Sequence, residues 1–131
     1  MANTPSTVRY TRLLILLNAL LWLAFGLVTA VGAHPSYPEP GTLRWAMAIS
    51  ALLAAAFLGT IVGPAARRNR IAYWAVVFVL AAISVAAIFD QFGVADLGFE
   101  IITLLPLALL IRDRNWYLQP TRVRSDGNRA A

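Results

Sequence analysis

The sequence predicts an all-α polytopic membrane protein whose four transmembrane helices form an up-down-up-down bundle. Three observations lead to this fold class. The chain is 60% hydrophobic, whereas a typical soluble domain is about 45–50% apolar. Only 13% of its residues are charged, whereas about 25% is usual. The apolar residues form four long runs with short polar segments between them, which is typical of helices that cross a bilayer.

The first predicted span covers residues 13–33 and the second covers residues 43–62. Each run is close to the ~20 apolar residues that a helix needs to cross the hydrocarbon core. The segment between them cannot continue a helix, because it contains Pro35, Pro38, Pro40 and Gly41.

A secretory signal peptide is the alternative interpretation of the first span. Arg9 and Arg12 precede the apolar run, and Val31-Gly32-Ala33 resembles a small-residue cleavage site. The apolar run is longer than the ~7–15 residues of a usual signal peptide. We therefore expect a retained transmembrane helix.

The third predicted span covers residues 71–89 and the fourth covers residues 94–111. Asp96 and Glu100 interrupt the start of the fourth span, so a start at Leu97 is an alternative. A loop beginning at Gly63-Pro64 is expected between spans two and three. Short loops favour antiparallel neighbours. The sequence thus predicts one domain over residues 1–118 and a flexible basic cytoplasmic tail over residues 119–131.

The arginines predict the orientation of the bundle. Ten of the eleven fall in three clusters, which would share one side of a membrane: Arg9 and Arg12; Arg67, Arg68 and Arg70; Arg112, Arg114, Arg122, Arg124 and Arg129. Only Arg44 would lie on the opposite side. Positively charged loops are retained in the cytoplasm, so both termini should be cytoplasmic in a multi-pass protein of the bacterial cytoplasmic membrane.

The composition also excludes several functions. The net charge of +5 could indicate nucleic-acid binding, but the arginines border apolar spans, where they favour anionic lipid at the cytoplasmic face. Cysteine is absent, His34 is the single histidine, and no motif of a known catalytic site is present. We therefore expect no enzyme, no catalytic residue, no metal and no cofactor.

The polar residues of the spans predict a shallow cleft at the outer end of the bundle. Glu100 is its main residue, because an ionisable group within a span usually faces the interior and is a candidate proton carrier or cation ligand. Thr29 and three cleft residues, Ser50, Ser84 and Thr103, are expected in the outer half. The full candidate cleft comprises Glu100, Asp96, Asp90, Arg44, Ser50, Ser84 and Thr103.

Two alternatives accompany this cleft. If the fourth span begins at Leu97, Asp96 is an N-cap and Glu100 is a favourable charge in the first turn, which Arg44 could neutralise. Asn18, expected in the inner half, begins a stripe at helical spacing with Trp22, Phe25 and Thr29. We interpret that stripe as a packing face with one interhelical hydrogen bond.

Small residues in the second span predict close helix packing, mainly within the chain. A homodimer through Ala51, Ala55 and Gly59 is the alternative. The favoured function is a non-enzymatic accessory or interaction subunit, or a bundle that binds lipid or partner helices. The alternative function is a small proton- or cation-linked carrier or channel that uses Glu100.

Chain length and span number resemble the small multidrug resistance transporters and the small fluoride channels. The first family has its proton-coupled glutamate in the first span, where this sequence has Asn18. Both families form antiparallel dimers, which require insertion in both orientations. The arginine distribution of ten to one disagrees with dual insertion.

Overall fold

The computed structural model describes residues 6–88 and 94–119, and all regular secondary structure in these two ranges is helical. The elements are α1 (Ser6–Ala30), α2 (Thr42–Ala66), α3 (Arg70–Ile88), α4 (Val94–Arg112) and α5 (Arg114–Leu118). The all-α prediction is therefore confirmed for these ranges. Asp90 and residues 120–131 lie outside them, so the predicted tail is not described beyond Gln119.

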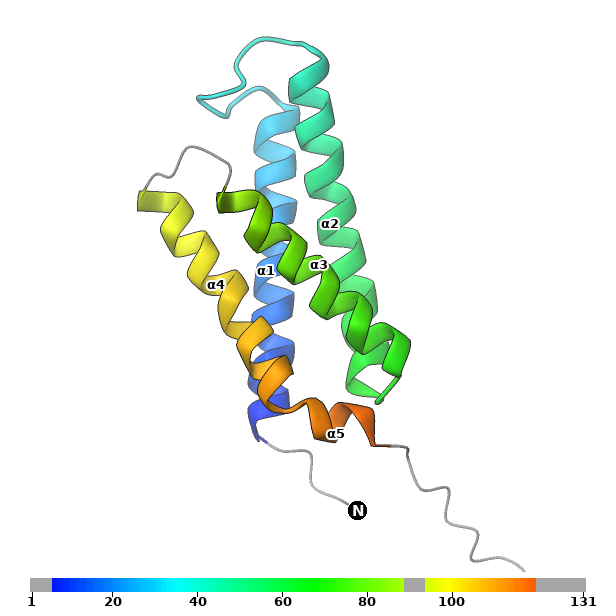
Figure 1. Ribbon diagram of the computed structural model, residues 1–131. Coiled ribbons are helices and arrows are strands. Elements are labelled where there is room, and N and C mark those ends of the chain that lie inside the picture. Colours follow the sequence, from blue (N-terminus) through cyan, green and yellow to red (C-terminus); the bar gives the residue numbers. More distant parts are fainter. Residues whose placement is uncertain (1–5, 89–93, 120–131) are drawn as a thin grey trace, which may run out of the picture.

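The four long helices run alternately up and down and lie side by side (Figure 1). Each contacts two others, in the order α1, α2, α3, α4 and back to α1. Helix α5 lies across the lower end of the molecule, where it contacts α3 and α4. By length and composition, α1 and α2 could each cross a membrane.

The junction of α2 and α3 corrects one sequence-based boundary. A loop was expected from Gly63-Pro64, but α2 continues through Pro64 to Ala66. Pro64 lacks the backbone N–H that would donate to the Thr60 carbonyl, but it lies so near the end of α2 that only two helical residues follow it. The helix ends at Ala66. Two residues later, Arg68 has a left-handed φ of 62°, and its N–H donates to the carbonyl of Ala65 at 3.0 Å.

Asn69 then starts α3 as an N-cap. Its Oδ1 accepts hydrogen bonds from the backbone N–H groups of Ile71 at 3.0 Å and Ala72 at 3.2 Å. These bonds satisfy two of the donors that have no partner in a first helical turn. The connection is therefore tight, and it lies, with the start of α3, at the same end of the molecule as α5.

The apolar core lies mainly in the arginine-bearing half of the molecule. Its largest fully buried apolar side chains are Tyr73, Leu58, Leu80, Leu110 and Val76. The ring of Tyr73 stacks on that of Tyr117 with centroids 5.4 Å apart, and its hydroxyl donates to the Leu110 carbonyl at 3.1 Å. Arg70 donates twice to the Leu118 carbonyl, at 3.2 and 3.0 Å, which fixes α5 against α3.

In the opposite half, small residues allow α1 and α2 to pack closely. Ala48, Ala51 and Ala55 of α2 are buried, as is Gly26 of α1. A Cβ placed on Gly26 would lie 2.9 Å from the side chain of Leu52. The buried polar side chains of Thr29, Ser84 and Glu100 also lie in this half.

Candidate functional site

A side-chain hydrogen bond joins α1 to α4 in the interior of the molecule. The Nδ2 of Asn18 donates to Oγ1 of Thr103 at 2.7 Å, and both residues are fully buried. Asn18 is the central residue of the 25-residue α1, and Thr103 is the central residue of the 19-residue α4. The predicted interhelical bond of Asn18 is confirmed, but the expected separation of Asn18 and Thr103 into inner and outer halves is wrong.

Glu100 lies one helical turn from Thr103, toward the start of α4. Only 7% of its surface is exposed, and its Oε2 has no hydrogen-bond partner in the described part of the chain. Because α4 begins at Val94, Glu100 is about 9 Å into the helix rather than in its first turn. The alternative start at Leu97, with its first-turn role for Glu100, is therefore wrong.

Aromatic rings of α1 and α4 pack against each other next to Glu100 in the chain. Trp22 of α1 contacts Phe99 of α4 edge to face with centroids 5.1 Å apart, and it contacts Phe25 at 5.9 Å. The Nε1 of Trp22 is buried and has no hydrogen-bond partner among the described residues. Phe99 directly precedes Glu100 in α4. The contact between Trp22 and Phe99 therefore places Trp22 close to the level of Glu100 along the bundle.

Two further hydroxyl groups are buried on neighbouring helices. Ser84 of α3 is 6% exposed and Thr29 of α1 is fully buried. Neither hydroxyl oxygen has a partner in the described ranges. Helix α3 contacts α4, so Ser84 and Glu100 come from adjacent elements.

The other predicted cleft residues lie elsewhere or outside the described ranges. Arg44 donates to the carbonyls of Ala30 at 2.7 Å and Pro38 at 3.4 Å, so it caps the C-terminus of α1. Ser50 is exposed and donates to the Met47 carbonyl of its own helix. Asp96 belongs to α4, but its side chain is not described, and Asp90 is not described at all.

The resulting candidate site is the set of polar groups buried on the neighbouring helices α1, α4 and α3, which we call the polar layer: Asn18, Trp22, Ser84, Glu100 and Thr103. It contains one carboxylate and, besides it, hydroxyl, amide and indole groups. No group of three His, Cys, Asp or Glu residues occurs in the part of the chain that the structure describes. Such a layer can exchange a proton at the carboxylate or hold one small cation beside it.

Sequence reasoning identified Glu100, Ser84 and Thr103 but treated Trp22 and Asn18 as packing residues. The stripe of Asn18, Trp22 and Thr29 at helical spacing was the signal that α1 supplies polar groups to the same interior. Chain topology determines which helix faces this stripe, and α4 is that helix. The periodicity of α1 alone cannot show that α4 is the facing helix.

The chain matches no protein-family model, no curated protein and no solved structure. The polar layer is the feature of the structure that most narrows the possible functions of the chain.

Proposed function

We propose that the chain is an integral membrane protein with four transmembrane helices and both termini in the cytoplasm, and that it carries a proton or small cation by way of Glu100. The observation that carries the proposal is the burial of Glu100 with a carboxylate oxygen that has no hydrogen-bond partner among the described residues. An ionisable group inside a membrane domain is expensive, and it usually marks a proton or ion pathway.

Exposed apolar side chains on all four long helices support the membrane placement. Helices α3 and α4 expose Ile71, Phe78, Ile101 and Leu105, by 82%, 74%, 50% and 47% of their surface. A soluble monomer rarely exposes so much apolar surface, whereas lipid would cover it. Helices α1 and α2 expose leucines in the same way.

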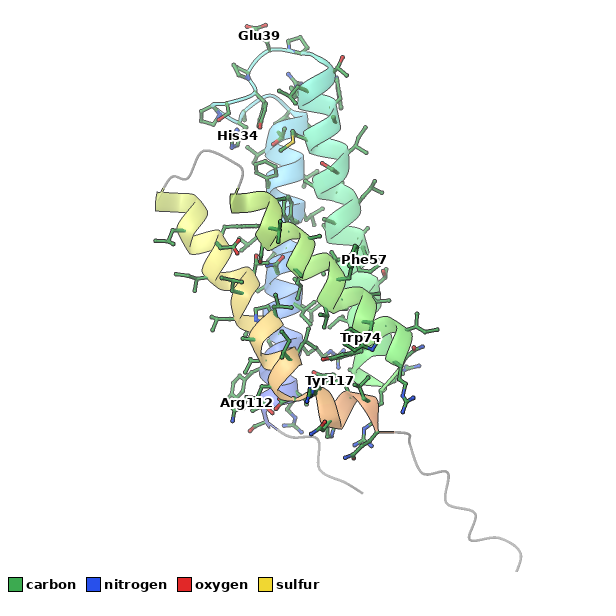
Figure 2. All side chains as sticks on the ribbon, viewed as in Figure 1. His34, Glu39, Phe57, Trp74, Arg112 and Tyr117 are labelled. Atoms are coloured by element: carbon green, nitrogen blue, oxygen red, sulfur yellow. The ribbon has the colours of Figure 1, made fainter. Side chains whose placement is uncertain are left out.

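The charge distribution supports the orientation. The start of α1, the α2–α3 connection and α5 lie together at the lower end, and all three carry arginines. In Figure 2, Arg112 lies at that end, whereas His34 and Glu39 lie at the other. Arginines that share one end favour a cytoplasmic location for it.

The surroundings of Glu100 favour a small cation or proton over a larger substrate. Aromatic rings lie beside the layer, and the Asn18–Thr103 bond joins the helices next to it. The hydroxyl groups and the Asn18 Oδ1, which has no partner among the described residues, offer neutral oxygen atoms. These are the ligands that a carboxylate-bound monovalent ion or hydronium would need.

Flux measurements in proteoliposomes test the proposal. Glu100→Gln keeps the side-chain size but removes the titratable group, so we expect it to abolish proton or cation flux. Glu39→Gln is the matched control, because Glu39 is an exposed loop residue. Flux that is unchanged in Glu100→Gln would refute the carrier.

An accessory subunit that binds a partner helix is the second candidate function, and an open groove favours it. The groove lies between α1 and α2 and has Gly59 on its α2 side. Ala51 and Ala55 are buried by the chain itself, whereas Gly59 is exposed. A partner helix or second copy would therefore meet the groove at Gly59, and a stoichiometric protein that co-purifies in mild detergent would support this candidate.

A further inference from the structure

Two hollows follow the same seam between α1 and α2. The first is the apolar groove, of about 330 Å³, lined by Leu16, Ala19, Leu20 and Leu23 of α1 and by Leu52, Ala55, Ala56 and Gly59 of α2. The second, which we call the arginine pocket, has a volume of about 350 Å³ and is lined by Val8, Arg9, Arg12, Gly63, Ala66 and Arg67. One hollow is apolar and the other is strongly basic.

The two hollows are consecutive along both helices. Arg12 in the pocket precedes Leu16 in the groove by one turn of α1, and Gly63 follows Gly59 by one turn of α2. One turn corresponds to about 5.4 Å along the helix axis. The seam therefore changes from apolar to basic within one turn, near the lower end of α1 and α2 (Figure 1).

Glycine keeps the seam open on its α2 side. A Cβ placed on Gly59 or Gly63 would meet no atom within 4 Å. On the α1 side of the groove, Leu16, Leu20 and Leu23 are exposed. The groove is therefore an open apolar surface that residues 6–88 and 94–119 do not fill.

Three of the residues that line the arginine pocket are arginines, and none of its lining residues is acidic. Other arginines at this end are engaged elsewhere: Arg68 lies 4.5 Å from the ring centroid of Trp116, and Arg70 binds the Leu118 carbonyl. The first turn of α1 contains no acidic residue and ends at Arg9. The N–H groups of this first turn have no partner within the helix, and they add to the positive potential at this end of α1.

We propose that this seam binds one anionic phospholipid, with the phosphate in the arginine pocket and an acyl chain in the groove. Guanidinium groups form strong charge-assisted hydrogen bonds with phosphate, and the adjoining groove suits a hydrocarbon chain. The proposal assumes the membrane placement above, in which the arginines face the cytoplasmic leaflet. It does not depend on Glu100.

The test is native mass spectrometry of the full chain in detergent with three probes. Phosphatidylglycerol carries both the anionic headgroup and acyl chains, phosphatidylcholine with the same chains is zwitterionic, and inorganic phosphate lacks the chains. We expect one tightly bound phosphatidylglycerol, binding of phosphatidylcholine at least about tenfold weaker, and little displacement by inorganic phosphate.

Variants locate the site. Arg9→Gln with Arg67→Gln should weaken phosphatidylglycerol binding by about tenfold or more, the equivalent of one charge-assisted hydrogen bond. Arg112→Gln with Arg114→Gln removes the same charge from exposed positions outside the pocket and should change binding less than about twofold. Gly59→Leu should fill the groove and weaken binding without any change in charge.

Several results would overturn the proposal. Equal weakening by the two double variants would mean a diffuse positive surface instead of a pocket. Equal binding of phosphatidylcholine would remove the role of the arginines, and displacement by inorganic phosphate would indicate a soluble anion. A dimer that Gly59→Leu dissociates would make the occupant a second copy. Glu100→Gln should keep phosphatidylglycerol binding, so failure of the carrier and failure of the lipid site can be told apart.

Discussion

The amide of Asn18 and the hydroxyl of Thr103 form a 2.7 Å hydrogen bond between the midpoints of α1 and α4. Thr103 also donates to the Phe99 carbonyl of its own helix at 3.0 Å. The two residues therefore depend on this bond unequally. Thr103 keeps a partner if Asn18 is lost, whereas Nδ2 of Asn18 loses its partner if Thr103 is lost.

This asymmetry predicts the outcome of a double-mutant cycle. Thr103→Val should destabilise the fold more than Asn18→Leu, because it leaves a buried amide donor unpaired. The coupling free energy should be about 0.6 kcal/mol, with about 1.7 kcal/mol as the upper end for bonds of this kind in membranes. Reversible unfolding in detergent measures it, and additive effects would show that the bond contributes nothing.

Gly26 and Gly59 should respond oppositely to alanine. At Gly26 a Cβ would lie 2.9 Å from Leu52 and 3.3 Å from the Ala48 carbonyl, so Gly26→Ala should cost about 1–3 kcal/mol of unfolding free energy. At Gly59 the space is open, and Gly59→Ala should be neutral or stabilise by up to about 1 kcal/mol through helix propensity. Thermal unfolding of both variants checks the contrast, which equal shifts would contradict.

The docking of α5 should weaken at alkaline pH. Burial, with a smaller contribution from Asp113, raises the pKa of Tyr117 from 10.0 to about 12. The unfolded chain therefore loses this proton first, so the stabilisation is complete below pH 10.0 and is lost as the pH rises through about 12. Unfolding temperatures across this range should fall, and Tyr117→Phe should reduce the fall relative to Tyr10→Phe.

An equal fall in all three proteins would mean that Tyr117 is not the responsible group. Tyr10 is a suitable comparison because it is 63% exposed, whereas Tyr117 is 3% exposed. The stacked ring of Tyr73 should keep Tyr117→Phe folded, since the phenyl ring retains the aromatic contact.

Hydropathy predicted the existence of the helices better than their ends. Hydropathy places the first span at residues 13–33, but α1 begins at Ser6. Hydropathy detects the apolar part of a helix, whereas the helix itself can extend into the polar residues before it. The Gly63-Pro64 pair favoured a loop, although α2 continues through Pro64 to Ala66. At α4, the predicted start at Val94 agrees with the structure, and the alternative at Leu97 does not.

The candidate site could be predicted only in part, because it depends on which helices are neighbours. Glu100 was identifiable as an ionisable residue in an apolar run. Its neighbours on α1 were not, since Asn18 had been placed in the opposite half of the bilayer. The sequence suggested Arg44 as a counter-charge for Glu100, but its guanidinium group donates a hydrogen bond to the Ala30 carbonyl instead.

Infrared difference spectroscopy of the protein in lipid bilayers tests the central claim, that the buried carboxyl of Glu100 exchanges a proton or small cation. We predict that a change of the proton or cation concentration outside alters a carboxyl band, that Glu100→Gln lacks one component of this change, and that Glu39→Gln retains that component. A spectrum of Glu100→Gln identical to that of the unmodified protein at every pH and cation concentration would contradict the account.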